Sequence, residues 1–165
     1  VTTCPHDYNT LKNEYKGLGG DYEVLHHTEF IYELINNKRL IVSGDFKGEK
    51  ITYHDPCYLG RGNNIFSVPR DLIKKIGFDL VEMPRSKKSS FCCGAGGAQM
   101  FKEPEKGNQD ININRTKEAL NMNTKVIATG CSFCNTMITD GVKFLAEGSV
   151  EVLDIAELIV KAENL

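Results

Sequence analysis

Five cysteines in this chain are spaced so that they could hold one metal centre. They follow the pattern Cys-x34-Cys-Cys-x37-Cys-x2-Cys, and they are Cys57, Cys92, Cys93, Cys131 and Cys134. Thiolates are soft ligands that select zinc, copper(I) and iron–sulfur clusters. A zinc ion completes a tetrahedral shell with four ligands, so a fifth thiolate would have no role beside it. A centre with several irons can use all five.

The adjacent cysteines Cys92 and Cys93 need a bend in the chain to reach the same centre. Successive side chains of a regular strand point to opposite faces, so an extended segment would separate these two sulfurs. Glycines follow at Gly94, Gly96 and Gly97. Because glycine lacks the Cβ atom that forbids positive φ, this run permits the bend.

Composition limits the classes of protein that remain. The chain has 165 residues, of which 41% are hydrophobic, and a net charge of −2, as expected of one globular domain, or one and a fraction, with an ordinary core. That charge gives no broad basic field for nucleic acid or a membrane surface. No apolar run approaches the roughly 18 to 20 residues of a membrane helix. The chain begins with Val1 and not with Met, which is expected of a piece of something longer.

Six cysteines also allow three disulfides, so that alternative has to be weighed. The chain has no secretory hydrophobic segment, and a vicinal pair followed by Cys-x2-Cys is more typical of intracellular ligation. Metal binding is therefore the better interpretation.

Two predicted strands end immediately before cysteines. One covers residues 50–55 and leads to Pro56-Cys57; the other covers 125–129 and leads to Cys131. In α/β sheets the ligand sites lie at the carboxyl ends of the strands. Further strands are predicted at 22–26, 79–83 and 151–153, and helices at 8–15, 28–37, 69–76, 110–122, from Cys134 to about 147, and at 156–162. This alternation predicts an α/β fold with a mostly parallel sheet flanked by helices.

Two local assignments complete the prediction. Thr28 is expected to cap the helix that follows it. The adjacent His26 and His27 are expected to have solvated or capping roles, since neighbours at a strand end diverge. No element is predicted for residues 97–108.

The two ends of the chain resemble each other. Thr3-Cys4-Pro5-His6-Asp7 parallels Gly130-Cys131-Ser132-Phe133-Cys134, and Tyr22-Glu23-Val24-Leu25 parallels Val150-Glu151-Val152-Leu153. Self-similarity of this kind indicates duplicated units. We therefore expect residues 1–40 to be the tail of a first unit and residues 41–165 to be a complete second unit.

The same cysteines carry a family resemblance. The pattern resembles the cysteine-rich CCG domain, which occurs twice in the B subunit of heterodisulfide reductase and also in iron–sulfur subunits of glycolate, lactate and anaerobic glycerol-3-phosphate oxidation and in some succinate dehydrogenases. The stretches 54–61 and 92–97 more closely resemble a bacterial branch of membrane-associated proteins. Those proteins are thought to pass electrons between flavoproteins, such as electron-transfer flavoprotein, and a quinone pool.

The resemblance implies a ligand set. It makes the five cysteines ligands of a [4Fe-4S] cluster of the noncubane kind, although a CCG motif has been associated with zinc in some members. His54 and Asp55 would hydrogen-bond cluster sulfur or tune its potential from behind the ligands, or they are strand-end residues satisfied by the backbone. Gly94 and Gly96 are also expected behind the ligands. Cys4 would serve a cluster of the preceding unit.

Asp7 departs from the family's fullest pattern. It stands where a second cysteine would complete Cys-x2-Cys, which leaves open whether the first site holds a cubane cluster, another metal or nothing. A role at the start of a helix would explain Asp7 at least as well.

Three functions follow from these observations. The first is an electron relay between a flavoprotein and a quinone- or thiol-linked acceptor, as a subunit or domain of an oxidoreductase, cytoplasmic or peripheral to the inner face of the membrane. The second is cleavage of a disulfide at the cluster, which needs an open cavity. The third is a zinc-stabilised interaction domain.

Basic residues offer a docking patch for an acidic partner or are simply solvated; they are Arg61, Arg70, Arg85, Lys87 and Lys88.

Overall fold

A four-stranded parallel sheet forms the centre of the molecule. The computed structural model describes residues 1–43, 46–103 and 106–163. The strands are β1 (Lys50–Tyr53), β2 (Asp79–Leu80), β3 (Val126–Thr129) and β4 (Glu151–Asp154), in the order β2-β1-β3-β4 with every pair parallel. The predicted α/β class with a parallel sheet is confirmed.

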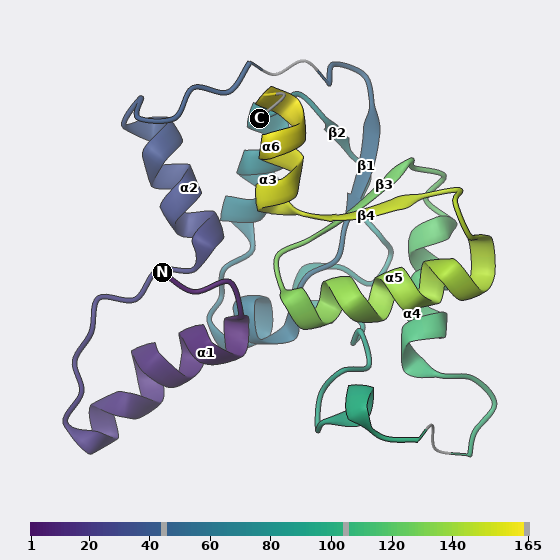
Figure 1. Ribbon diagram of the computed structural model, residues 1–165, viewed down its shortest axis with the longest axis horizontal. Helices are drawn as coiled ribbons and strands as arrows, with labels where there is room; N and C mark the ends of the chain where they lie inside the picture. The colour runs from purple at the N-terminus through teal and green to yellow at the C-terminus, as the bar shows by residue number, and fades with distance from the viewer. Residues whose placement is uncertain (44–45, 104–105, 164–165) are drawn as a thin grey trace.

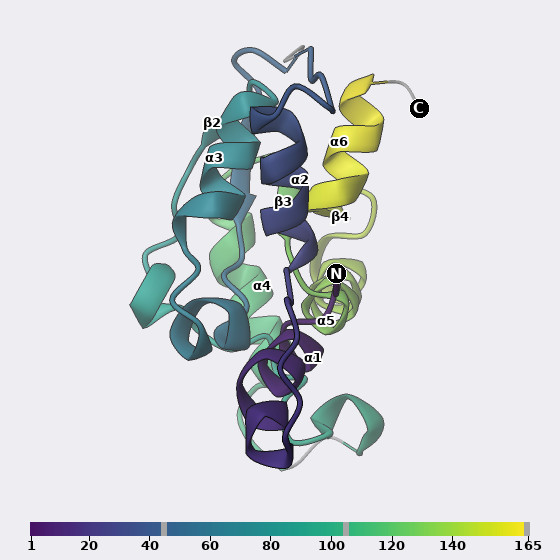
Figure 2. The same ribbon diagram turned by 90° about the vertical axis from the view of Figure 1, so that its left-hand side faces the viewer.

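Helices cover both faces of this sheet (Figure 1). On one face lie α2 (His27–Asn36), α3 (Ser67–Lys75) and α6 (Ile155–Glu163), and on the other lie α4 (Ile111–Leu120) and α5 (Ser132–Ala146). Figure 2 shows the same layers from the side, with α1 (Pro5–Asn9) beyond one end of the sheet.

Strand residues alternate between two apolar clusters. Val126 and Ala128 of β3 pack with α3 and α6, whereas Ile127 packs with α4 and α5. Successive side chains of a strand point to opposite faces, and all four residues of β3 are buried. A strand buried on both faces is typical of a parallel sheet between helical layers.

The strand order reverses between β1 and β3. From β1 the chain crosses through α3 to β2, then returns through α4 to β3 on the other side of β1. Because parallel crossovers are right-handed, these opposite moves place α3 and α4 on opposite faces. A crevice opens at the carboxyl ends of strands where such a reversal occurs, and β1 and β3 both end there.

The N-terminal segment lies beside this site. After α1 the helical path continues through a π-type turn (Thr10–Glu14) and a 3-10 turn (Tyr15–Leu18), so the predicted helix at 8–15 begins earlier, at Pro5. The predicted strand at 22–26 is reduced to one parallel bridge between Thr2 and His26. The His27 amide donates to the Thr2 carbonyl at 2.8 Å.

Several predicted boundaries shift. β1 ends at Tyr53, which leaves His54 and Asp55 beyond the strand, and β2 at the sheet edge has two residues in place of five. The cap of α2 is His26 and not Thr28: its side chain accepts from the Thr28 amide while Glu29 accepts from the His26 amide. This reciprocal pair is a capping box built on histidine.

Candidate metal centre

All five cysteines of the pattern line one small cavity. Its volume is about 20 Å³, which is room for about one water molecule. The cavity is also lined by Pro5, His6, Tyr58 and Phe133. The structure therefore brings together every cysteine that the spacing singled out, from segments far apart in the sequence.

Two neighbouring strands deliver three of these cysteines. Cys57 follows β1 and begins the helical turn Tyr58–Gly62, and Cys131 follows β3 as the N-cap of α5, with Cys134 in the first turn. Since β1 and β3 are paired, their ends lie side by side. The N-terminus of a helix favours negative charge, so α5 is suited to hold anionic sulfur.

The remaining two sulfurs come from a bent loop between β2 and α4. Gly94 has φ of +93°, and its amide donates to the Sγ atom of Cys92 at 3.3 Å. Gly97 also has positive φ, but Gly96 does not. The bend that Cys92 and Cys93 require is therefore made at Gly94, and Gly96 lies at the cavity wall.

Hydrogen bonds between the sulfurs separate their pKa values. All six cysteines are free, and Cys134 Sγ donates to Cys93 Sγ at 3.3 Å. Hydrogen bonds from Cys134 and Cys92 lower the pKa of Cys93, and a hydrogen bond from Cys134 lowers the pKa of Cys131. Burial raises the pKa of Cys57. The site thus favours thiolates at some positions, and the thiolate is the form that binds metal.

Asp55 anchors the loop that carries Cys92 and Cys93. Its carboxylate accepts from both terminal nitrogens of Arg70 at 2.7 and 2.9 Å and from the Lys87 amide at 2.8 Å. Its carbonyl accepts from the Ser90 hydroxyl at 2.9 Å. Asp55 therefore ties residues 87–90 to the end of β1, which positions the cysteines that follow.

Arg70 corrects one expectation. It is not a solvated loop residue or part of an exposed docking patch, because it lies in α3 and is buried, with Asp55 on one side and Glu82 on the other. Lys87 and Lys88 are exposed as expected. Arg61 is exposed too, and it donates to the Ser90 carbonyl.

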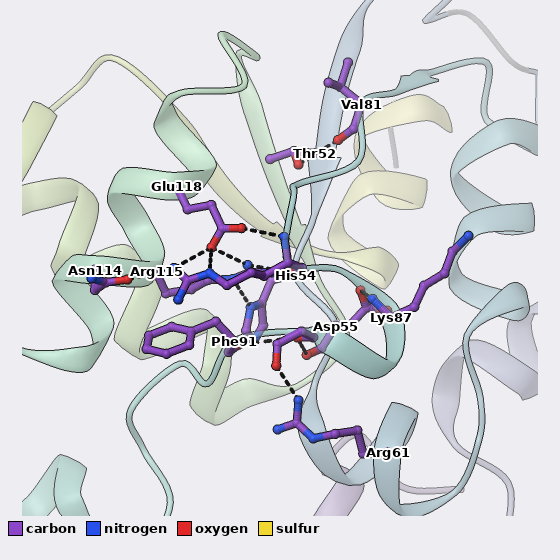
Figure 3. A network of polar contacts seen from close by, with 12 residues as sticks. Thr52, His54, Asp55, Arg61, Val81, Lys87, Phe91, Asn114, Arg115 and Glu118 are labelled. Atoms are coloured by element: carbon purple, nitrogen blue, oxygen red, sulfur yellow. Dashed lines mark hydrogen bonds and ion pairs between the residues drawn. The ribbon is translucent and has the colours of Figure 1, made fainter.

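A second polar network was not foreseen. Arg115 in α4 is fully buried, and its Nε atom donates to His54 Nδ1 at 3.0 Å (Figure 3). It also donates to Glu118 at 2.9 Å and to the Arg85 carbonyl. The sequence shows Arg115 and Glu118 three residues apart on a predicted helix. Such pairs are usual on exposed helix faces, so the spacing did not indicate a buried network.

His54 stands between this network and the sulfurs. Its ligating nitrogen and the sulfurs of Cys93 and Cys134 lie within 4.8 Å of one another. Burial lowers the pKa of His54, and the imidazole in turn lowers the pKa of Cys93.

Cys4 stands apart from the five. It is buried with its Sγ atom 3.7 Å from His6 Nδ1, and it is not among the residues that line the cavity. Asp7 is exposed in the first turn of α1, where an acidic residue favours the helix.

The paired histidines are buried, so the solvated role is wrong, whereas the capping role holds for His26. Thr28 Oγ1 lies 2.8 Å from His26 Nδ1. His27 Nε2 lies 2.9 Å from Asp154 Oδ1. His26 therefore caps α2, and His27 joins α2 to the end of β4.

Comparison with known proteins gives the family. Residues 51–139 match the cysteine-rich domain named CCG. The chain belongs to the CCG cysteine-rich domain family. The match contains all five cysteines of the candidate centre, and it confirms the family resemblance inferred from their spacing.

Relatives of this CCG domain are iron–sulfur oxidoreductases. The chain is 47% identical to the probable iron-sulfur-binding oxidoreductase FadF of Bacillus subtilis over 98% of its own length and 23% of the relative. It is 44% identical to the EtfAB:quinone oxidoreductase of Syntrophomonas wolfei, over 98% and 24%. It is 37% identical to one subunit of the dihydromethanophenazine:CoB–CoM heterodisulfide reductase of Methanosarcina barkeri, over 87% and 35%. The chain thus spans about a quarter to a third of these relatives.

None of the described helices combines the length and the apolar character that a membrane crossing requires.

Proposed function

We propose that this CCG domain is the iron–sulfur electron-transfer module of an oxidoreductase. The observation that supports this most directly is the presence of five cysteines around one small cavity. A single zinc ion uses four such ligands, so the donor set fits a cluster of several irons better. When bound, a cluster here would supply one-electron transfer.

The proposed cluster is a [4Fe-4S] centre of the noncubane kind, held by the five cysteines. The protein's own contribution is its surroundings: Met100, Phe133 and Met137 pack against Cys93, Cys131 and Cys134 and shield these three from water. The Gly94 amide donates to the Cys92 sulfur. Solvent exclusion and hydrogen bonds to sulfur are the means by which a protein sets a cluster potential.

The proposed partners are a flavoprotein donor and a quinone- or thiol-linked acceptor, reached through regions of the whole protein outside this chain. The similarity to an EtfAB:quinone oxidoreductase supports this assignment. The same similarity supports the proposed location of the whole protein, in the cytoplasm and peripheral to the inner face of the membrane.

Cleavage of a disulfide at the cluster is the second candidate, because one relative is a heterodisulfide reductase subunit. That reaction needs space for a thiol substrate beside the metal. His6, Tyr58 and Phe133 line the cavity, and the relay is the function that needs no substrate to enter past them.

We also propose the domain division expected from the repeat, with residues 1–40 as the tail of a first unit and 41–165 as a complete second unit. The N-terminal segment supports it. Cys4 precedes α1 as Cys131 precedes α5, and the Thr2–His26 bridge leads into α2 as the β3–β4 pair leads into α6.

The test compares the full-length protein with its Cys93→Ser variant, both reconstituted without oxygen. We expect Cys93→Ser to remove or distort the visible and paramagnetic signals, with a loss of up to about four irons and four sulfides per chain. Ser132→Ala, an exposed change next to Cys131, is the control and should keep the spectrum.

Two results would contradict the proposal. One tightly bound zinc per site, without sulfide, would mean that the cysteines form a structural zinc site. Unchanged absorption in Cys93→Ser would remove Cys93 from the ligand set.

A further inference from the structure

The environment of His54 admits two opposite roles. With Cys93 and Cys134 it forms a group whose ligating atoms lie within 4.8 Å of one another. A histidine and cysteines so placed could bind a metal through imidazole nitrogen, as in mixed zinc sites. Alternatively, the imidazole N–H could donate a hydrogen bond to sulfur. The two roles require the ring proton on different nitrogens.

Arg115 decides between these roles. A guanidinium has only N–H donors, and Arg115 Nε lies 3.0 Å from His54 Nδ1. The nitrogen that it contacts must therefore be the acceptor of the ring. An imidazole whose Nδ1 is an acceptor carries its single proton on Nε2, so the second nitrogen is a donor and has no lone pair for a metal.

The surroundings hold Arg115 in this position. Its Nη1 atom donates to Glu118 at 2.9 Å and to the Arg85 carbonyl at 2.9 Å, and its side chain is 0% exposed. Among the described residues, Nη2 has no hydrogen-bond partner. A buried ion pair is often no more stable than apolar residues of similar volume, so packing does not require the Arg115–Glu118 pair, and the contact with His54 gives it a role.

We propose that Arg115 is a positioning residue that fixes the tautomer of His54, so that His54 donates a hydrogen bond to the Cys93 sulfur and is excluded from the metal's ligand set. This inference rests on the proposed metal centre. Hydrogen bonds to cluster sulfur stabilise the more negative, reduced state and raise the potential. Arg115 thereby acts on the cluster through a side chain 61 positions away in sequence.

The first test uses pulsed electron paramagnetic resonance on the reduced, full-length protein labelled with [15N]histidine, in H₂O and in D₂O. We expect weak nitrogen coupling and a proton coupling that disappears in D₂O, as for a ring N–H donated to sulfur. Strong nitrogen coupling, as for a directly bonded imidazole, would overturn the proposal. So would the absence of an exchangeable histidine proton from a spectrum that otherwise shows the cluster.

The second test compares Arg115→Met with Arg85→Met. Arg85 pairs with the same Glu118 at 2.8 Å but has no side-chain contact to His54 among the described residues, so it is a matched control for loss of nearby charge. We expect Arg115→Met to lose the exchangeable coupling and to shift the potential downward, while Arg85→Met keeps the coupling.

A double-variant comparison separates the tautomer from the charge of Arg115. In a His54→Gln background the ring is absent, so Arg115→Met should shift the potential by less than it does beside His54. Equal shifts in the two backgrounds would show that only the charge of Arg115 affects the potential.

If Arg115→Met does not fold, the pulsed electron paramagnetic resonance of the unsubstituted protein still tests whether His54 donates to sulfur. If no sample binds iron and sulfide, the proposed function fails; a normal cluster without the histidine coupling refutes only this inference.

Discussion

His26 is fully buried, and its ring caps the N-terminus of α2. Burial, followed by the charge of His27, lowers the pKa of His26 from 6.5 to about 3. In the folded protein the ring therefore stays neutral under conditions that protonate it in the unfolded chain. Its Nδ1 atom accepts from the Thr28 amide, and a protonated ring could not accept that bond.

This pKa shift makes the stability of the fold depend on pH. Between pH 6.5 and about 3 the unfolded state binds the proton and the folded state does not, so the free energy of unfolding decreases as pH falls through this range. The group contributes up to ~1.4 kcal/mol per pH unit. We expect His26→Asn, which keeps a good N-cap, to flatten this slope in urea unfolding measured from pH 4 to 7. Parallel slopes for the two proteins would contradict the assignment.

A residue could be predicted from the sequence when its own spacing carried the signal. It could not be predicted when its role depends on a partner from a distant part of the chain. The cysteines were found because their own spacing is informative. Asp55 was expected to act behind the ligands, but its anchoring of Lys87 and Ser90 depends on the path of a loop. Arg115 was missed because its partner His54 comes from another element.

At the scale of elements, α4 and α5 are in close contact at a glycine. A Cβ atom added at Gly141 would lie 2.2 Å from Thr116 Oγ1 and 2.9 Å from Thr116 Cβ. Thr116 is fully buried, so it has no free space to move into. The two helices can pack at this distance only because position 141 has no side chain.

We therefore expect Gly141→Ala to destabilise the protein. Overpacking a core costs about 1–3 kcal/mol, against roughly 1 kcal/mol gained from alanine's helix propensity, for a net loss of up to about 2 kcal/mol in urea unfolding. Gly17→Ala is the control, since its added Cβ would meet nothing within 4 Å. Identical unfolding midpoints for the two variants would rule out the close contact.

Elements were predictable where burial repeats in the sequence. The apolar runs of β1 and β3 and the faces of α3, α5 and α6 were located to within a few residues. β2 is shorter than its sequence suggested and pairs with β1 over two residues only, and the segment 22–26 has a single bridge. Residues 97–103 and 106–108 contain only the short turn Gln99–Phe101, in agreement with the lack of any periodic signal there.

At the scale of the whole molecule, the candidate metal centre takes its cysteines from strand ends and from a loop. Cys57, Cys131 and Cys134 lie at the ends of paired strands, whereas Cys92 and Cys93 lie on a loop that is held by side-chain contacts. Loops held by a few side-chain contacts open at lower free energy than core strands. Metal bound to both parts would tie the loop to the sheet.

Loss of the metal should therefore loosen the molecule unevenly. We expect amide hydrogen exchange to increase in residues 91–101 after the metal is removed by oxidation and chelation, while β1 and β3 remain protected. Reconstitution should restore protection of the loop, which controls for damage to the chain. A uniform increase across the sheet would instead mean that the metal supports the whole fold.

The strand order also determines when this site can form during synthesis. β1 lies between β2, which is made next, and β3, which is made last of the three. From Cys57 the ribosome has to add 77 residues before Cys134 exists. Throughout that interval one edge of β1 is unpaired and the early thiols have no complete set of partners. Cofactor delivery therefore belongs to the end of translation or later, and a nascent chain stalled before β3 would present oxidisable sulfur beside an open strand edge.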